Sequence, residues 1–257
     1  MSSVKVAQFR VGESNYNYII YNPESKKGIV VDPLDAKPVL EKVRDLGVSI
    51  SHIINTHGHS DHIAGNSRVK KETGAILIGP AKEGIEGVDQ TLDHNQELKV
   101  DGIHVQAFFM PGHTPGHISL LVNNEHLLVG DILFLGGCGN CKFGGNPDQL
   151  FESLQELMKL PDHLKIYVGH EYALKNLEFG KTYDPQNQAI VQMLEKVEKT
   201  LASGEAPLTT LGEEKIHNVF LRSGHPDVMK PLKKKFPKVS EDPRSIFKKL
   251  RELRNSF

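Results

Sequence analysis

The 257-residue chain has only two cysteines, Cys138 and Cys141, and no long apolar run. Two cysteines three positions apart cannot form the disulfide framework of a small secreted domain. No segment approaches the ~18 apolar residues that a membrane-spanning helix requires, and the first residues lack an apolar secretion core. We therefore expect a cytoplasmic protein that does not bind a membrane.

An excess of charge of one sign is also missing. The chain has 31 Lys+Arg and 32 Asp+Glu, for a net charge of −1. Without a basic excess we expect no nucleic-acid partner. The one basic cluster, Lys230 to Lys238, is interrupted by prolines and is typical of a solvated surface. The length suits one large α/β domain with a smaller appendage.

The order of apolar residues divides the chain into two parts. Up to about Glu171, short strands alternate with helices, one of which is predicted over 61–73, ending at Gly74. Beyond it, helical periods and the capping-box pattern of Thr210 to Glu213 predict an all-helical tail. We expect this tail to be a separate, appended domain.

Histidine is abundant, with 13 in the chain, and it is concentrated in the segment Thr56-His57-Gly58-His59-Ser60-Asp61-His62. This segment directly follows the apolar strand residues Ile53 and Ile54. Functional sites form at the carboxyl ends of strands in α/β sheets. Imidazole and carboxylate together suit zinc, iron or manganese. A merely polar, histidine-rich loop is the alternative.

Three more candidate ligands make that alternative less attractive. His113, Asp131 and His170 each follow an apolar strand that ends in glycine, a residue that lets the backbone turn sharply. The candidates now number seven, which is too many for one tetrahedral ion. The seven suit two ions that share a bridging carboxylate, and we assign the bridge to Asp131.

These motifs resemble those of a known family. The histidine segment, Gly112-His113-Thr114, Gly130-Asp131 and Gly169-His170-Glu171-Tyr172 are together similar to the metallo-β-lactamase superfamily, and more narrowly to glyoxalase II, the hydroxyacylglutathione hydrolases. The resemblance implies an α/β fold, an αββα sandwich with an all-helical C-terminal domain. We expect a catalytic domain over residues 1–174 and a helical substrate-binding domain over 175–257.

The same resemblance implies a site and a reaction. One divalent ion is expected at His57, His59 and His113, a second at Asp61, His62 and His170, with Asp131 bridging them. Metal-bound hydroxide would attack the thioester of S-D-lactoylglutathione, releasing glutathione and a 2-hydroxy acid, with Asp61 and Asp131 as catalytic residues. The resemblance assigns contacts with the thiol carrier to Tyr172 and Arg222.

The loop after Cys138 departs from the family pattern. Where the family has a basic residue that holds a glutathione carboxylate, this chain has Asn140, and Lys142 is the nearest substitute. We expect the Cys138–Cys141 pair to belong to a plain loop beside the site, with a redox role as the alternative. His117 is expected beside the site rather than as a ligand.

Other functions remain open on the sequence alone. A persulfide dioxygenase would use one iron and O₂, and would be expected to lack the helical tail and to carry His-Asp-Tyr at 170–172. A broader esterase, lactonase or β-lactamase of the same superfamily is a second alternative, and a binding protein on a degenerate scaffold is a third. Metal identity (zinc, iron or manganese) stays open, and we expect a monomer or weak homo-oligomer.

Overall fold

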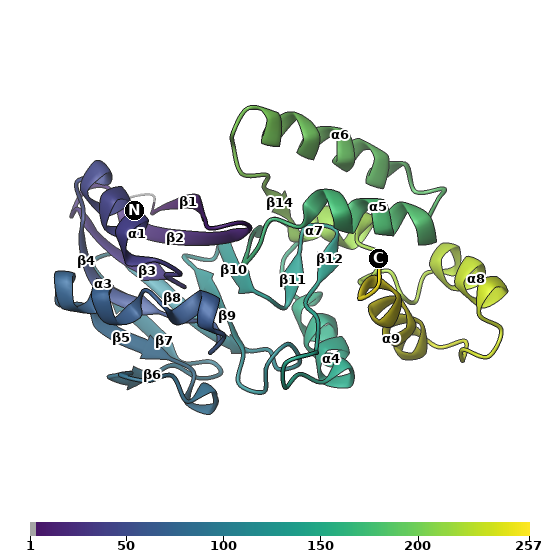
Figure 1. The fold of residues 1–257 in the computed structure, drawn as a ribbon, viewed down its shortest axis with the longest axis horizontal. Helices are drawn as coiled ribbons and strands as arrows, with labels where there is room; N and C mark the ends of the chain where they lie inside the picture. The colour runs from purple at the N-terminus through teal and green to yellow at the C-terminus, as the bar shows by residue number, and fades with distance from the viewer. Residues whose placement is uncertain (1–3) are drawn as a thin grey trace.

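Two six-stranded sheets form the body of the computed structural model, which describes residues 4–257 (Figure 1). The first sheet consists, in spatial order, of β1 (Lys5–Val11), β2 (Asn15–Asn22), β3 (Lys27–Val31), β4 (Ser49–Ile54), β5 (Ile76–Gly79) and β6 (Gln90–Thr91). Its first three strands are antiparallel and the next three join in parallel.

The second sheet consists, in spatial order, of β14 (Thr209–Thr210), β13 (Lys165–Val168), β10 (His126–Gly130), β9 (Ile118–Val122), β8 (Ile103–Phe109) and β7 (Glu97–Val100). Only its β10–β13 pair is parallel. A small hairpin of β11 (Leu133–Phe134) and β12 (Gly137–Cys138) follows β10.

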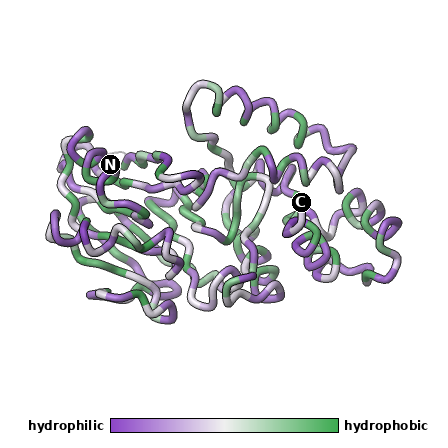
Figure 2. Tube along the Cα trace, viewed as in Figure 1, coloured by the Kyte–Doolittle hydropathy of each residue, from purple (hydrophilic) through white to green (hydrophobic). Residues whose placement is uncertain are grey.

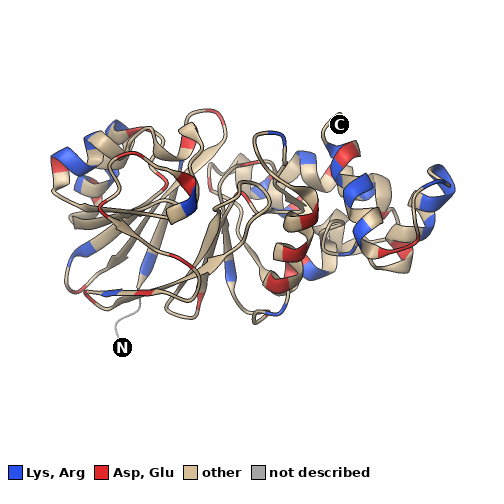
Figure 3. Ribbon diagram, turned by 90° about the horizontal axis from the view of Figure 1, so that it is seen from below, with Lys and Arg blue, Asp and Glu red and all other residues tan. Residues whose placement is uncertain are grey.

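Alternation along β4 explains how the sheets are packed. Ile54 faces a core cluster that it shares with strands of the second sheet, whereas Ile53 faces helices α1 (Ala36–Leu46) and α3 (Asn66–Thr73). Because successive strand residues point to opposite faces, Ile53 and Ile54 contribute to the two cores on opposite sides of the first sheet. Figure 2 shows the strands as mostly hydrophobic, and Figure 3 shows that charged residues gather on helices and loops. The predicted α/β sandwich is confirmed.

The helix predicted over 61–73 is wrong as a single element. The structure has α2 (Ser60–Ile63) and then α3, with Gly65 between them. The Gly65 amide donates to the Pro33 carbonyl at 2.8 Å, and a Cβ on Gly65 would lie 2.7 Å from that oxygen. This close approach breaks the helix and holds α2 at the end of β4.

The tail contains α5 (Ala173–Tyr183), α6 (Gln188–Ala202), α7 (Leu211–His217), α8 (Pro226–Lys235) and α9 (Pro243–Arg254). It is helical except for β14, which pairs with β13 and joins the tail to the second sheet. The predicted capping box of Thr210 and Glu213 is confirmed at the start of α7. α9 packs beside α4 (Pro147–Leu157). Within residues 4–257, no helix combines the length and apolar character needed to cross a membrane.

Candidate metal centre

Three of the candidate ligands meet at the end of β4. His57 and His59 follow this strand of the first sheet, while His113 follows β8 of the second. Each offers one ligand atom, and the three atoms lie within 4.8 Å of one another. His113 Nε2 is 3.0 Å from His59 Nδ1. We call these residues the first trio, and it draws on both sheets.

A second trio consists of Asp61, His62 and His170. The first two lie in the short helix α2, and His170 follows β13 of the second sheet. His170 Nε2 is 3.3 Å from His62 Nε2 and 3.4 Å from Asp61 Oδ2. This trio also joins the two sheets.

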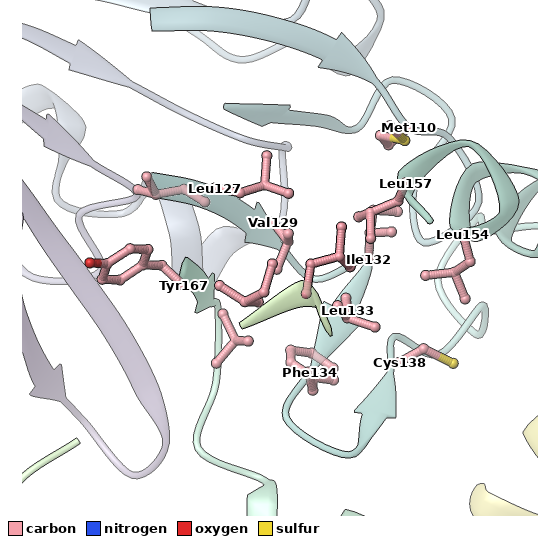
Figure 4. Packing of buried hydrophobic residues seen from close by; sticks show 14 of the residues in the cluster. Met110, Leu127, Val129, Ile132, Leu133, Phe134, Cys138, Leu154, Leu157 and Tyr167 are labelled. Carbon is pink, nitrogen blue, oxygen red and sulfur yellow. The ribbon is translucent and has the colours of Figure 1, made fainter. Parts of the chain in front are cut away.

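Asp131 lies between the trios. Its Oδ2 is 3.4 Å from His113 Nε2 and 3.3 Å from His170 Nε2, and its Oδ1 is 3.6 Å from His62 Nε2. The neighbouring residues Val129 and Ile132 are fully buried in the core of Figure 4, which fixes the chain at this point. The structure therefore places the expected bridging carboxylate where it faces both trios.

The spacing of the ligand atoms matches what a divalent ion requires. Ligands 2.0–2.2 Å from a tetrahedral ion stand roughly 3.4 Å apart, close to the separations above. Among the described residues, the buried atoms His57 Nε2, His59 Nε2 and Asp131 Oδ1 have no hydrogen-bond partner. Buried polar atoms normally have one. The donor set and its unsatisfied atoms fit divalent metal ions.

Protonation of the site follows from burial and from its carboxylates. Burial, reinforced by neighbouring His62, holds the pKa of His57 well below its usual value. Its ring is therefore neutral and has a lone pair available for a metal ion. Burial also disfavours the charged form of His62, but Asp131, Asp32 and Asp61 outweigh it and raise its pKa to about 9. Burial raises the pKa of Asp131, yet the imidazoles of His170 and His62 hold it well below the usual range. The carboxylates thus concentrate negative potential at a point where a cation is favoured.

Asp32 is a site residue that the sequence analysis missed. Its carboxylate accepts hydrogen bonds from Thr56 N at 2.8 Å and Thr56 Oγ1 at 2.6 Å, and faces His62 Nδ1 at 3.1 Å. It also belongs to a third possible ligand group with His57 and His62, but these contacts already occupy it. Asp32 therefore orients His62 and leaves Nε2 to face Asp131. Its position after β3, like that of the other site residues after their strands, was the available signal.

His117 supports the bridging residue from behind. Its Nε2 accepts a hydrogen bond from the Asp131 backbone N–H at 3.1 Å, and its ring stacks on His57 with 5.0 Å between centroids. Gly130, which precedes Asp131, has φ +51, and a Cβ there would lie 2.6 Å from His117 Nε2. A side chain at 130 would thus displace the support of Asp131.

A cavity of about 280 Å³ lies beside the second trio. Three of the expected carrier contacts, Tyr172, Asn140 and Lys142, line it. The Tyr172 ring stacks on His170 with 5.0 Å between centroids, which links the cavity to the trio. Its charged lining residues, within the described chain, are all cations: Lys142, Lys175, Arg251 and Arg254.

Arg222, the fourth expected contact, lies elsewhere. Its Nε donates to Asp184 Oδ2 at 2.8 Å, and Asp184 is almost fully buried. A buried carboxylate needs such a partner, so Arg222 is engaged in the tail. Arg251 and Arg254 of α9 line the cavity instead. Sequence reasoning missed them, although a spacing of three places two arginines on one face of a helix, and the tail was predicted to be helical.

The two cysteines are free; Cys138 lines this cavity, and Cys141 lines a neighbouring one that shares Lys142 and Arg251 with it. Burial raises the pKa of Cys138 to about 11 and that of Cys141 to about 12. The Cys138 carbonyl accepts a hydrogen bond from Arg251 Nη1 at 2.6 Å. The loop thus contributes through its backbone, while its thiols are poor nucleophiles.

Comparisons with known proteins agree along the whole chain. Residues 11–170 match the family model of the metallo-beta-lactamase superfamily, and residues 171–257 match that of the hydroxyacylglutathione hydrolase C-terminus. A hydroxyacylglutathione hydrolase of Ectopseudomonas mendocina is 39% identical over 95% of both chains. One of Rhizobium meliloti is 35% identical over 100% of both.

Solved structures share the fold. ETHE1 from Myxococcus xanthus superposes with a TM-score of 0.68 at 24% identity, covering 98% of this chain and 99% of that one. The BLEG-1 B3 metallo-beta-lactamase gives a TM-score of 0.66 at 23% identity, covering 84% of this chain and 99% of its own. At these identities the likeness concerns the fold alone.

Replacing Asp32 should weaken metal binding. Asp32→Ala removes the acceptor that orients His62, so we expect a loss of about 10- to 100-fold in zinc affinity. Competition with a chromophoric chelator measures it. Asp35→Ala, at the exposed cap of α1, is the matched control and should leave the zinc affinity unchanged. Unchanged affinity in Asp32→Ala would show that His62 does not need this partner.

The two thiols should react slowly with iodoacetamide. At pH 8 a thiol with a pKa of about 11 is thiolate in only about one molecule per thousand. We expect alkylation of the folded protein at least about 100-fold slower than that of the same chain in denaturant, as followed by mass spectrometry. Rapid modification of both thiols in the folded protein would instead favour a reactive redox pair.

Proposed function

The chain belongs to the hydroxyacylglutathione hydrolase family of the metallo-beta-lactamase superfamily, and we propose that it hydrolyses the thioester of S-(2-hydroxyacyl)glutathione, such as S-D-lactoylglutathione. The products are glutathione and a 2-hydroxy acid. The observation that carries this proposal is the adjacency of two ligand trios and a cation-lined cavity, joined by the stack of Tyr172 on His170.

We propose two divalent metal ions, of zinc, iron or manganese. His57, His59 and His113 would hold one, and Asp61, His62 and His170 the other, with Asp131 contributing to both. When bound, such ions supply Lewis acidity that polarises the thioester carbonyl and lowers the pKa of water.

The carboxylate of Asp61 would accept a hydrogen bond from the attacking water. Although burial opposes it, neighbouring His62 and a hydrogen bond from Asn15 lower the pKa of Asp61, so it remains a carboxylate. Its side chain is 41% exposed, which leaves an oxygen free to accept a hydrogen bond from water. The leaving thiol has a pKa of ~8.5 and departs as a thiolate, so the reaction needs no strong proton donor from the protein.

The cavity would bind the thiol carrier through its carboxylates. Lys142, Lys175 and the two arginines of α9 provide charge-assisted donors there. Burial, together with repulsion between the neighbours Arg251 and Arg254, lowers the pKa of Arg254. An anion between them would relieve the repulsion. In this view residues 1–174 carry the chemistry and the helical part, 175–257, completes the substrate site.

Hydrolysis of S-D-lactoylglutathione by the metal-replete protein tests the proposal. We expect loss of the thioester, release of one thiol per turnover, and abolition of both by a chelator with recovery on adding metal. The rates with a lactone and a β-lactam should be far lower. Fast lactone cleavage without thioester cleavage would reject the proposal, as would a single iron and O₂ uptake with glutathione persulfide.

Arg254→Ala should raise KM with little change in kcat. It removes a charge-assisted donor worth about 1.5–3 kcal/mol, which corresponds to about 10- to 100-fold in KM, whereas the reacting atoms are untouched. Arg222→Lys is the control, because it keeps a cation beside Asp184, outside the cavity. Steady-state kinetics on S-D-lactoylglutathione separate the two. If KM increased only in the Arg222 variant, Arg222 rather than Arg254 would contact the thiol carrier.

A further inference from the structure

The tip of the hairpin between β1 and β2 pairs with the segment that follows β13 of the second sheet. Tyr16 N donates to Gly169 O at 2.8 Å, and Glu171 N donates to Ser14 O at 2.8 Å. Asn15 and His170 form an isolated antiparallel bridge between these bonds. The tip of the hairpin is therefore paired with the segment that carries a ligand of the second trio.

Side chains of the same tip contact two ligands of that trio. Asn15 is buried, and its Nδ2 donates to Asp61 Oδ2 at 3.0 Å and to the Asp61 carbonyl at 3.2 Å. Ser14 Oγ is 3.1 Å from His170 Nδ1. Engaging Nδ1 in this way leaves His170 Nε2 directed at Asp131, 3.3 Å away. Asn15 thus orients the carboxylate of Asp61, and Ser14 orients the imidazole of His170.

A different residue joins the loops of the first trio. Glu83 Oε2 accepts from Gly58 N at 2.8 Å, and Glu83 Oε1 accepts from Gly116 N at 2.5 Å. Gly58 lies between the ligands His57 and His59, while Gly116 lies in the turn that follows His113. One carboxylate therefore spans the two loops that carry the first trio. Within residues 4–257, the side chains of Ser14 and Asn15 make no hydrogen bond to this trio.

We propose that the two trios are positioned by separate elements, the hairpin tip Ser14–Asn15 for the second and Glu83 for the first. This inference rests on the metal centre of the proposed function. Partners of metal ligands typically contribute 10- to 100-fold to affinity when they fix ligand orientation. Each element should therefore control the affinity of its own trio and leave the other unchanged.

A crossed set of variants tests this separation, with zinc alone as the probe and no substrate present. His59→Ala disables the first trio and His170→Ala the second. In the His59→Ala background, Asn15→Ala or Ser14→Ala should weaken zinc binding about 10- to 100-fold and Glu83→Ala less than about 2-fold. In the His170→Ala background the pattern should reverse. Chelator competition gives the affinities.

Matched controls are an exposed serine and an exposed glutamate away from the trios. Ser25→Ala lies in the exposed turn between β2 and β3, and Glu86→Ala is exposed three residues after Glu83. Neither should change zinc affinity in either background. Thermal unfolding of the zinc-free variants checks the fold, and Ser14→Ala serves if Asn15→Ala does not fold. If a background variant binds no zinc, the Ser14, Asn15 and Glu83 substitutions are made in the chain with all ligands intact. Zinc titration should then show two binding steps, and each substitution should weaken only the step of its own trio.

Equal weakening in both backgrounds would overturn the proposal, because the hairpin and Glu83 would then act on the centre as a whole. Unchanged affinity in both would overturn it as well. Failure of the proposed function looks different: the unaltered protein would bind two zinc equivalents with the crossed pattern intact, yet would not cleave the thioester.

Discussion

The buried carboxylate of Asp131, set between two groups of imidazoles, is the interaction on which the rest of the site depends. Burying a carboxylate without compensation is costly, and here histidines from both sheets surround it. The backbone accommodates it at two glycines. Gly130 adopts φ +51, and a Cβ on Gly169 would lie 2.0 Å from Asp131 Oδ1. Asp131 therefore lies where the histidines of the two sheets meet.

The helical tail affects the site through the loop after β11 rather than through the ligands. Buried Glu214 of α7 accepts from Gly136 N at 3.1 Å and from Asn218 Nδ2 at 2.8 Å, and Asn218 Nδ2 also donates to Gly137 O at 2.9 Å. These bonds hold the β11–β12 hairpin, which leads into the loop of Asn140 and Lys142. Arg251 completes the arrangement by donating to Cys138 O. The tail thus shapes the cavity that leads to the second trio.

Much of this arrangement was predictable because strand ends bring distant residues together. The polar residues after β4, β8, β10 and β13 lie next to apolar strands in the sequence, so the sequence predicted that they would gather at strand ends, although these strands belong to two sheets. The partners of the supporting residues were not predictable, because Asp32, Ser14, Asn15 and Glu83 contact residues distant in the sequence and carry no local pattern that names those partners. Gly65 ended a helix through contact with Pro33, 32 positions earlier, and the arginine assigned to the carrier was engaged by Asp184. Each of these features depends on contacts between residues far apart in the sequence.

The central claim is that two metal ions occupy the two trios with Asp131 between them. Anomalous diffraction from crystals grown with zinc, recorded on both sides of the zinc absorption edge, tests it directly. The account predicts two peaks, one among His57, His59 and His113 and one among Asp61, His62 and His170, with the Asp131 carboxylate in contact with both. A single peak, or two peaks of which one lies away from Asp131, would contradict it.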